Sequence, residues 1–246
     1  MFKIWDKEIE CCSDHKKIEE IQLERLKYSV NKAYNNVKFY KDKFDEMGLS
    51  PDSVKSLEDI KNLPFTTKDD MRDNYPFGLF AEPKKNIVRI HASSGTTGKP
   101  VVAGYTKKDL DTWSTAIARI ATAAGIGEED IVQIAFGYGL FTGGFGLHYG
   151  IEKIGSMIVP MSSGNTQKQL MLMQDLGVTG LIATPSYAIY LSEMIEEMNI
   201  PRENFKLKYG LFGSEGMSEE MRKSLEEKMG ILVTSNYGLT EVMGPG

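Results

Sequence analysis

The order of secondary-structure signals from residue 86 onward is the strongest constraint on how this chain can fold. Short apolar runs rich in β-branched residues alternate with longer segments of helical periodicity, and glycines separate many of them. Strands that alternate with helices favour right-handed crossovers and a mainly parallel sheet. The predicted fold class is therefore α/β, a mainly parallel sheet with flanking helices. We predict strands over residues 87–91, 131–135, 157–159, 179–183, 207–212 and 231–235, and helices over 109–124, 145–154, 167–176, from Pro185 onward and from the cap Ser218 to Met229.

The first third of the chain carries a different, helical pattern. Between Asp14 and Met47 apolar residues recur at helical spacing, and Gly48 supplies a stop signal. This predicts one helix, or two with a break near residues 35–36. Short helical turns follow, with Thr66 or Thr67 capping a brief helix that Pro76 ends. We therefore divide the chain into an N-terminal helical segment, residues 1–85, and an α/β part, residues 86–246.

Composition excludes several classes of protein. A formal net charge of -5 argues against a dedicated nucleic-acid binder. No apolar run approaches the roughly 20 residues that span a bilayer, so no membrane partner is expected. The two cysteines, Cys11 and Cys12, are adjacent, which excludes a disulfide framework. A reducing cytoplasm fits this cysteine usage best.

A loop rich in hydroxyl groups follows the first predicted strand. Its glycines let backbone N–H groups point at an anion, its hydroxyls add donors, and its lysine suits a phosphate. It is not a Walker-type loop, because two residues, not four, separate its glycines. The alternative is a flexible loop without a ligand. The loop consists of Ser93, Ser94, Gly95, Thr96, Thr97, Gly98 and Lys99.

Three further loops follow predicted strands, at the edge where open parallel sheets bind ligands. In residues 235–241, Tyr237 offers a flat face to a base, Thr240 a donor to a phosphate and Glu241 an oxygen ligand for Mg²⁺. In residues 213–216, Glu215 is placed to accept from an amino group. Residues 136–144 alternate aromatics with glycines, as in a slot for a flat ligand. Surface turns and core packing are the alternatives, and His148 is interpreted as a core residue.

Taken together, these four loops resemble the adenylate-forming enzymes, the AMP-binding superfamily of acyl-CoA synthetases. Residues 93–100, S-S-G-T-T-G-K-P, and residues 237–241, Y-G-L-T-E, carry this resemblance. Residues 63–68, 72–78, 138–144 and 237–246 resemble the phenylacetate-CoA ligase branch. The resemblance implies the large N-terminal domain of these ligases and a reaction in two steps: an aryl acid, phenylacetate by best match, is adenylated by ATP with Mg²⁺ and then passed to coenzyme A.

The same resemblance implies a role for each loop. The hydroxyl-rich loop holds the β- and γ-phosphates, and Lys99, Thr240 and Glu241 act in catalysis, with Glu241 binding Mg²⁺. The residues implied for the nucleotide, besides that loop, are Ser214, Glu215, Ser235, Asn236, Tyr237, Gly238 and Thr240. Those implied for the aryl ring are Phe136, Tyr138, Phe141, Gly213, Ser214 and Asn236. Ser214 stands where the family often has Ala, and Phe136 where it often has Tyr, which leaves the identity of the acid open.

Two other functions stay open. One is a non-catalytic nucleotide-binding module, and the other is an adenylate-forming enzyme with a different acyl acceptor. The resemblance also implies a small C-terminal domain whose lysine assists adenylation, and no counterpart is found in these 246 residues. We therefore expect an N-terminal fragment that does not complete the cycle alone. The partners implied are small molecules, and a homodimer is left open.

Overall fold

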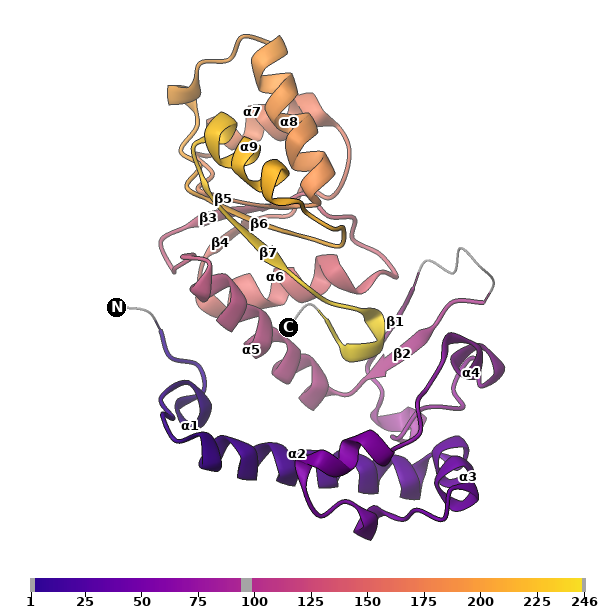
Figure 1. The fold of residues 1–246 in the computed structure, drawn as a ribbon. Coiled ribbons are helices and arrows are strands. Elements are labelled where there is room, and N and C mark those ends of the chain that lie inside the picture. The colour runs from indigo at the N-terminus through magenta and orange to yellow at the C-terminus, as the bar shows by residue number, and fades with distance from the viewer. Residues whose placement is uncertain (1–2, 94–98, 245–246) are drawn as a thin grey trace. The chain divides into compact units, whose positions relative to one another are not determined.

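The structure, a computed structural model, describes residues 3–93 and 99–244 and divides into two compact units (Figure 1). One unit comprises Ile4–Lys107, and the other comprises Lys108–Gly246 together with Met1–Lys3. Residues 86–107, which the sequence assigns to the α/β part, group with the helical segment. Among the described residues, no helix has both the length and the apolar character needed to cross a membrane.

Two helices form most of the smaller unit's core. They are α2 (His15–Asn36) and α3 (Lys38–Glu46), after the short α1 (Lys7–Glu10). Val37 separates them because its backbone is extended, with φ −124° and ψ 107°, while its side chain is 2% exposed. The predicted alternative of two helices is therefore confirmed, with the break one residue beyond the expected place. Val30, Phe44 and Val54 form the buried cluster that this break allows.

Short elements complete this unit. They are the 3-10 turns η1 (Pro51–Ser53), η2 (Leu57–Asn62) and η3 (Lys84–Asn86) and the helix α4 (Lys68–Asp73). The predicted cap of α4 is confirmed, because the Thr67 hydroxyl accepts from Asp70 N at 3.2 Å. In return the Asp70 carboxylate accepts from Thr67 N at 2.8 Å, which completes a capping box. The helix ends at Asp73, just before Pro76.

The first predicted strand required a correction. It spans Arg89–Ala92 (β1) and pairs antiparallel with Val102–Tyr105 (β2), a strand that the sequence pattern did not predict. β1 and β2 form a separate two-stranded antiparallel sheet, so this hairpin is not part of the parallel sheet. Gly104 obscured β2, because glycine is rare inside strands. A Cβ at this glycine would lie 2.5 Å from the Phe80 ring, so the position has no room for a side chain.

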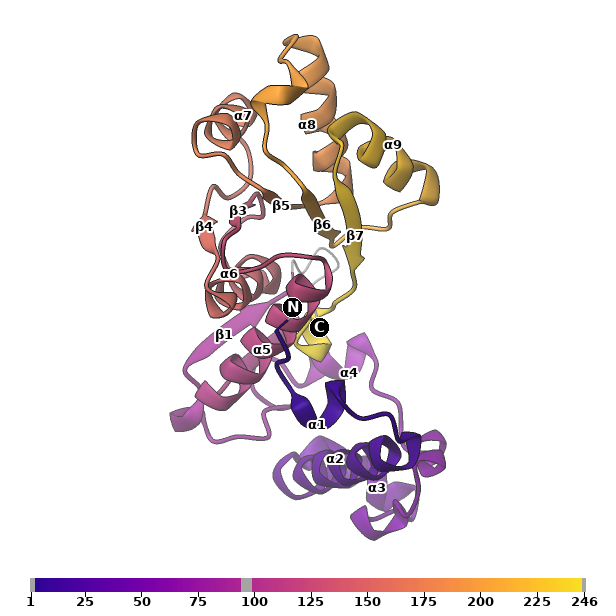
Figure 2. The same cartoon turned by 90° about the vertical axis from the view of Figure 1, so that its left-hand side faces the viewer.

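The larger unit contains a five-stranded sheet in the order β4-β3-β5-β6-β7, with all strands parallel. The predicted α/β fold class is therefore confirmed. Helices α7 to α9 cover one face of the sheet, and α5 and α6 cover the other (Figure 1, Figure 2). The strands are β3 (Ile131–Ile134), β4 (Met157–Val159), β5 (Gly180–Ala183), β6 (Tyr209–Gly213) and β7 (Leu232–Asn236). The helices are α5 (Lys107–Ala123), α6 (Thr142–Ile154), α7 (Thr166–Asp175), α8 (Pro185–Glu197) and α9 (Glu219–Met229), with the turns η4 (Arg202–Asn204) and η5 (Thr240–Val242).

Helix caps agree with the signals in the sequence. Pro185 occupies the first turn of α8, and the Thr184 hydroxyl accepts from Tyr187 N. Ser218 caps α9 by accepting from Met221 N, and Gly230 ends it with φ 61°. These local signals explain why most of the predicted element ends lie within two or three residues of the observed ones.

Helix α6 begins three residues earlier than predicted because its glycines serve helix packing. A Cβ on Gly146 would lie 2.3 Å from the Trp113 ring of α5, and one on Gly150 would lie 2.1 Å from Ile117 Cγ2. Bare backbone thus lets α6 approach two fully buried side chains of α5. Thr142 and the two glycines after it, predicted as loop, are helical and buried.

We predict that Gly150→Ala lowers the free energy of unfolding by about 1–3 kcal/mol, the usual cost of overpacking a core. The added methyl would meet Ile117, a β-branched residue with little freedom to move, and this outweighs the roughly 1 kcal/mol gained from helix propensity. Urea unfolding followed by circular dichroism measures the change. Gly127→Ala is the matched control, because its Cβ would have no neighbour closer than 3.8 Å. Equal losses in the two variants would contradict the packing argument.

Candidate functional site

The carboxyl ends of the five parallel strands meet at one edge of the sheet. Strand order places β4 on one side of β3 and β5 to β7 on the other, so the chain changes direction at β3. Open α/β sheets bind ligands beside such a switch point, beyond the strand ends. The predicted loops after β3, β6 and β7 all leave this edge. It is therefore the candidate site.

The last residues of β6 and β7 lie side by side. Gly213 pairs with Asn236 in the register, and a Cβ on this glycine would lie 2.5 Å from Asn236 Oδ1. Only glycine leaves room for that amide. Asn236 Oδ1 is buried and has no hydrogen-bond partner among the described residues. An unpaired buried acceptor is costly, so the edge offers a ready place for a ligand N–H or O–H.

Residues after β6 reach the start of a helix. Glu215 Oε2 accepts from Ser186 N at 3.3 Å, in the first turn of α8. A carboxylate there is favoured by the free N–H groups and the dipole of the helix. Ser214, directly before it, has a positive φ of 69°. The helix thus orients Glu215 while its other oxygen makes no hydrogen bond to the residues the structure describes.

Three kinds of side chain follow β7 within five residues. The Tyr237 ring is 74% exposed, and Thr240 is buried at 7% exposure in η5. Glu241 is half-buried, and its carboxylate has neither an ion pair nor a hydrogen bond with residues 3–93 or 99–244. Gly244 N donates to Leu239 O at 2.9 Å and closes the turn. A flat face, a hydroxyl and a free carboxylate are therefore presented together.

The aromatic side chains of the loop after β3 become more exposed along the chain. Phe136 is buried, Tyr138 is half-buried and Phe141 is 42% exposed. A Cβ on Gly143 would lie 2.5 Å from the Phe141 ring, so that ring folds back over glycine backbone. The start of α6 therefore packs against Phe141, and the slot that the sequence predicts here stays a prediction.

Two residues on α6 that the sequence did not assign to the site contact Tyr138. The Tyr138 hydroxyl lies 3.2 Å from His148 Nδ1, and its ring meets Phe145 edge-on at 5.4 Å between centroids. Burial raises the pKa of Tyr138 to about 12. His148 is half-buried, so its interpretation as a core residue is only partly right. The sequence signal that could have linked His148 to the site is its spacing of three residues from Phe145, which puts both side chains on one face of the helix.

The hydroxyl-rich loop belongs to the hairpin of the smaller unit. Ser93 Oγ accepts from Val101 N at 3.0 Å, so this predicted phosphate ligand also closes the hairpin. Lys99 is exposed, and its Nζ lies 5.3 Å from the centre of the Tyr75 ring. Ser94, Gly95, Thr96, Thr97 and Gly98 lie outside the described residues. The predicted convergence of this loop with Glu241 therefore stays a prediction.

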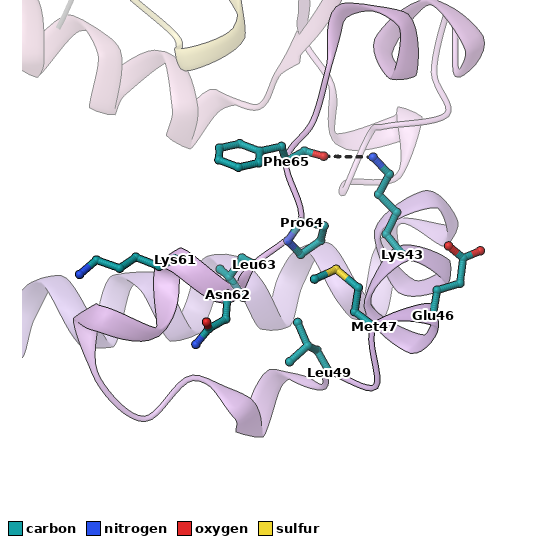
Figure 3. A pocket seen from close by; sticks show the side chains of 9 residues that line it. All are labelled: Lys43, Glu46, Met47, Leu49, Lys61, Asn62, Leu63, Pro64 and Phe65. Atoms are coloured by element: carbon teal, nitrogen blue, oxygen red, sulfur yellow. Dashed lines mark hydrogen bonds between the residues drawn. The ribbon is translucent and has the colours of Figure 1, made fainter.

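A further hollow lies in the smaller unit and contains none of the predicted site residues. Figure 3 shows its lining, where Lys43 Nζ donates to Phe65 O at 3.0 Å. The same ammonium group also pairs with Asp70, outside the lining, at 2.9 Å. Phe65 is 88% exposed. Among the described residues, no group of three or more His, Cys, Asp or Glu side chains is arranged to hold a metal. Glu241, the predicted Mg²⁺ ligand, is therefore not part of such a group.

We predict that Tyr138 makes folding more sensitive to alkaline pH. Its pKa is about 12 in the folded protein and about 10 when unfolded. The unfolded chain therefore loses the phenol proton first, so the stabilising contribution is present below pH 10 and is lost as pH rises toward 12. Urea unfolding at pH 8 to 11 should show wild type losing stability relative to Tyr138→Phe. A constant difference between the two proteins would contradict this.

Comparison with known proteins finds the same family that the sequence motifs resemble. The sequence model described as "AMP-binding enzyme" matches residues 16–246. The chain is 53% identical over 226 residues to phenylacetate-coenzyme A ligase of Aromatoleum evansii, covering 92% of this chain and 51% of that protein. It is 47% identical to the ligase of the same name from Escherichia coli (strain K12), with 93% and 53% covered. The chain spans about half the length of these curated relatives.

Solved structures agree with the fold. A 2-hydroxyisobutyryl-CoA ligase, in an open conformation with 2-HIB-AMP and CoA, aligns with a TM-score of 0.88 and 27% identity, covering 94% of this chain and 56% of that one. Its thioesterification state gives a TM-score of 0.89 at 28% identity, with 94% and 51% covered. With a family match over residues 16–246 and four strand-end loops in the expected order, the chain belongs to the AMP-binding enzyme family.

Proposed function

We propose that this chain forms the nucleotide- and acyl-binding part of an ATP-dependent, AMP-forming ligase for an aryl acid, with phenylacetate as the substrate and coenzyme A as the acceptor. The observation that carries the proposal is the carboxyl edge of the sheet, where loops suited to a base, a phosphate and an aromatic ring leave strands β3, β6 and β7. The relatives named phenylacetate-coenzyme A ligase support the choice of acid. The proposal concerns the complete protein that contains these residues, in the cytoplasm.

The chemistry has two steps. In the first, a carboxylate oxygen of the acid attacks the α-phosphorus of ATP, a P–O bond forms, and pyrophosphate leaves. In the second, the thiolate of coenzyme A attacks the acyl carbonyl, a C–S bond forms, and AMP leaves. Both steps depend on positioning and on neutralisation of negative charge.

Each group at the edge has a task in this scheme. Tyr237 packs its exposed ring on adenine, and Glu215 accepts from the amino group of the base. Thr240 donates to the α-phosphate. Lys99 belongs to the smaller unit, and it is the family resemblance that assigns it to the other phosphates. Glu241 suits Mg²⁺, because its carboxylate is free of ion pairs with the described residues. When bound, Mg²⁺ neutralises charge on the phosphates.

The aromatic loop accounts for an aryl substrate. Phe136, Tyr138 and Phe141 offer ring faces and edges, and aromatic pairs favour offset or edge-on contacts. The phenol of Tyr138 is neutral at physiological pH, and burial raises its pKa further, to about 12. Asn236 Oδ1, the unpaired buried acceptor, lies where nucleotide and acyl group are expected to meet. We assign the specificity for the acid to these four residues and Ser214.

Turnover by the complete protein tests the proposal. With ATP, Mg²⁺, coenzyme A and phenylacetate, we expect equal amounts of AMP, pyrophosphate and acyl-CoA. Glu241→Gln keeps the shape of the side chain but removes its charge, so we expect pyrophosphate release to fall at least about tenfold. ADP as the product, or no turnover with any aryl acid, would refute the ligase. Release of AMP only with another acceptor would favour the alternative transferase.

Adenine stacking gives a second prediction. Stacking of one base on an aromatic ring contributes about 1–3 kcal/mol, so Tyr237→Ala should weaken AMP binding about 5- to 150-fold. Tyr237→Phe keeps the ring and should change the Kd by less than about threefold. Isothermal titration calorimetry measures both values. Because this ring is 74% exposed, neither change should disturb folding. Unchanged affinity in Tyr237→Ala would remove Tyr237 from the nucleotide site.

A further inference from the structure

Two wholly buried amides lie beside the candidate site without belonging to it. Gln133 of β3 and Gln169 of α7 are each 0% exposed. Gln133 Nε2 donates to Gln169 Oε1 at 2.5 Å and to Gln169 O at 3.3 Å. Gln133 Oε1 has no partner among the described residues. Burying such groups is costly where apolar side chains of similar size would pack, so this pair calls for a functional reason.

The pair is anchored to the loop between β4 and α7. Gln169 Nε2 donates to Ser162 O at 2.7 Å and to Gly164 O at 3.2 Å. This loop has a left-handed backbone at three of four residues: Ser162, Gly164 and Asn165 have φ values of 63°, 84° and 50°. For residues other than glycine this conformation costs free energy and persists only where surrounding contacts enforce it. The two donated bonds are such contacts.

The same loop holds the backbone of the aromatic slot. Ser162 N donates to Ile134 O at 3.1 Å, and Ser162 Oγ accepts from Tyr138 N at 3.4 Å. A Cβ on Gly137 would lie 3.5 Å from Ser163 Oγ, so Ser163 lies close to the residue before Tyr138. A continuous series of contacts thus joins Gln133, Gln169, Ser162 and Tyr138. It ends on the backbone N–H of Tyr138, the residue whose ring we assign to the acid.

We infer that Gln133 and Gln169 are positioning residues that hold the loop at residues 162–165 and, through Ser162, fix Tyr138 against the aryl group of the acid. The inference rests on the proposed function and adds to it the source of specificity for the acid. Small displacements of a binding group are expensive, since even about 1 Å can cost a large factor in rate. Both amides are wholly buried, so the expected effect is on the fit of the acid and not on the reacting atoms.

The test is a comparison of KM values in the complete protein. Gln169→Met keeps the length of the side chain and removes both donors to the loop. We expect the KM for phenylacetate to rise about tenfold, with the KM for ATP and for coenzyme A changed by less than about twofold. Gln174→Met is the matched control on the same helix. Gln174 Nε2 donates to Leu170 O and its Oε1 accepts from Asn204 Nδ2 at 3.5 Å, neither of which belongs to the loop at residues 162–165, so this variant should leave all three values unchanged.

A second variant tests the last contact in the series. Ser162→Gly removes the hydroxyl while suiting the left-handed backbone, so folding should not suffer. It should also raise the KM for phenylacetate, and the double variant with Gln169→Met should show less than the product of the two single effects.

The outcomes separate the inference from the function on which it rests. A lowered Tm with unchanged KM values in Gln169→Met would give the pair a purely structural role and overturn the inference. Equal increases in the KM for acid and for ATP would overturn it too, because they indicate a general disturbance. If wild type adenylates no aryl acid, the proposed function fails and the inference fails with it.

Discussion

Parallel pairing of five short strands determines where this chain can carry out chemistry. Each strand of the sheet has its carboxyl end at the same edge. The sheet alone therefore brings together loops that are far apart in sequence, and no contact between their side chains is needed for this. The register of β6 and β7 also determines which single residues become neighbours, because it places Gly213 opposite Asn236. The loops after β3 and β7 can therefore change independently while the sheet keeps both at the same edge.

The face of the sheet covered by α5 and α6 constrains the site in a second way. Gly146 and Gly150 let α6 pack against Trp113 and Ile117, with no room for even a methyl group. This close approach fixes the position of α6, and Phe145 and His148 on α6 contact Tyr138. Tyr138 is thus held on one side by α6 and on the other by the loop after β4. Packing deep in the unit and the placement of Tyr138 are therefore connected.

Most of the fold was predictable because its signals are local. Caps such as Thr67, Thr184 and Ser218 act within three residues, and β4 lies at the predicted residues 157–159. The errors arose where distant contacts decide. Gly104 reads as a break but lies inside β2, because the Phe80 ring occupies its side-chain space. His148 reads as core, because its partner Tyr138 lies ten residues away on a loop whose course depends on Ser162.

The two edges of the sheet differ in how completely their polar groups are satisfied. At the amino edge, Asp130 accepts from Gly127 N and Thr179 Oγ1, both at 2.8 Å, while Thr179 Oγ1 accepts from Ile131 N at 3.0 Å. This network closes on itself and has a structural role. At the carboxyl edge, Asn236 Oδ1 is buried without a partner and Glu241 makes no ion pair with the described residues. Folding alone would favour pairing a buried acceptor such as Asn236 Oδ1. An unpaired buried acceptor costs stability unless a partner satisfies it, and this is the strongest physical reason for proposing a ligand at the carboxyl edge.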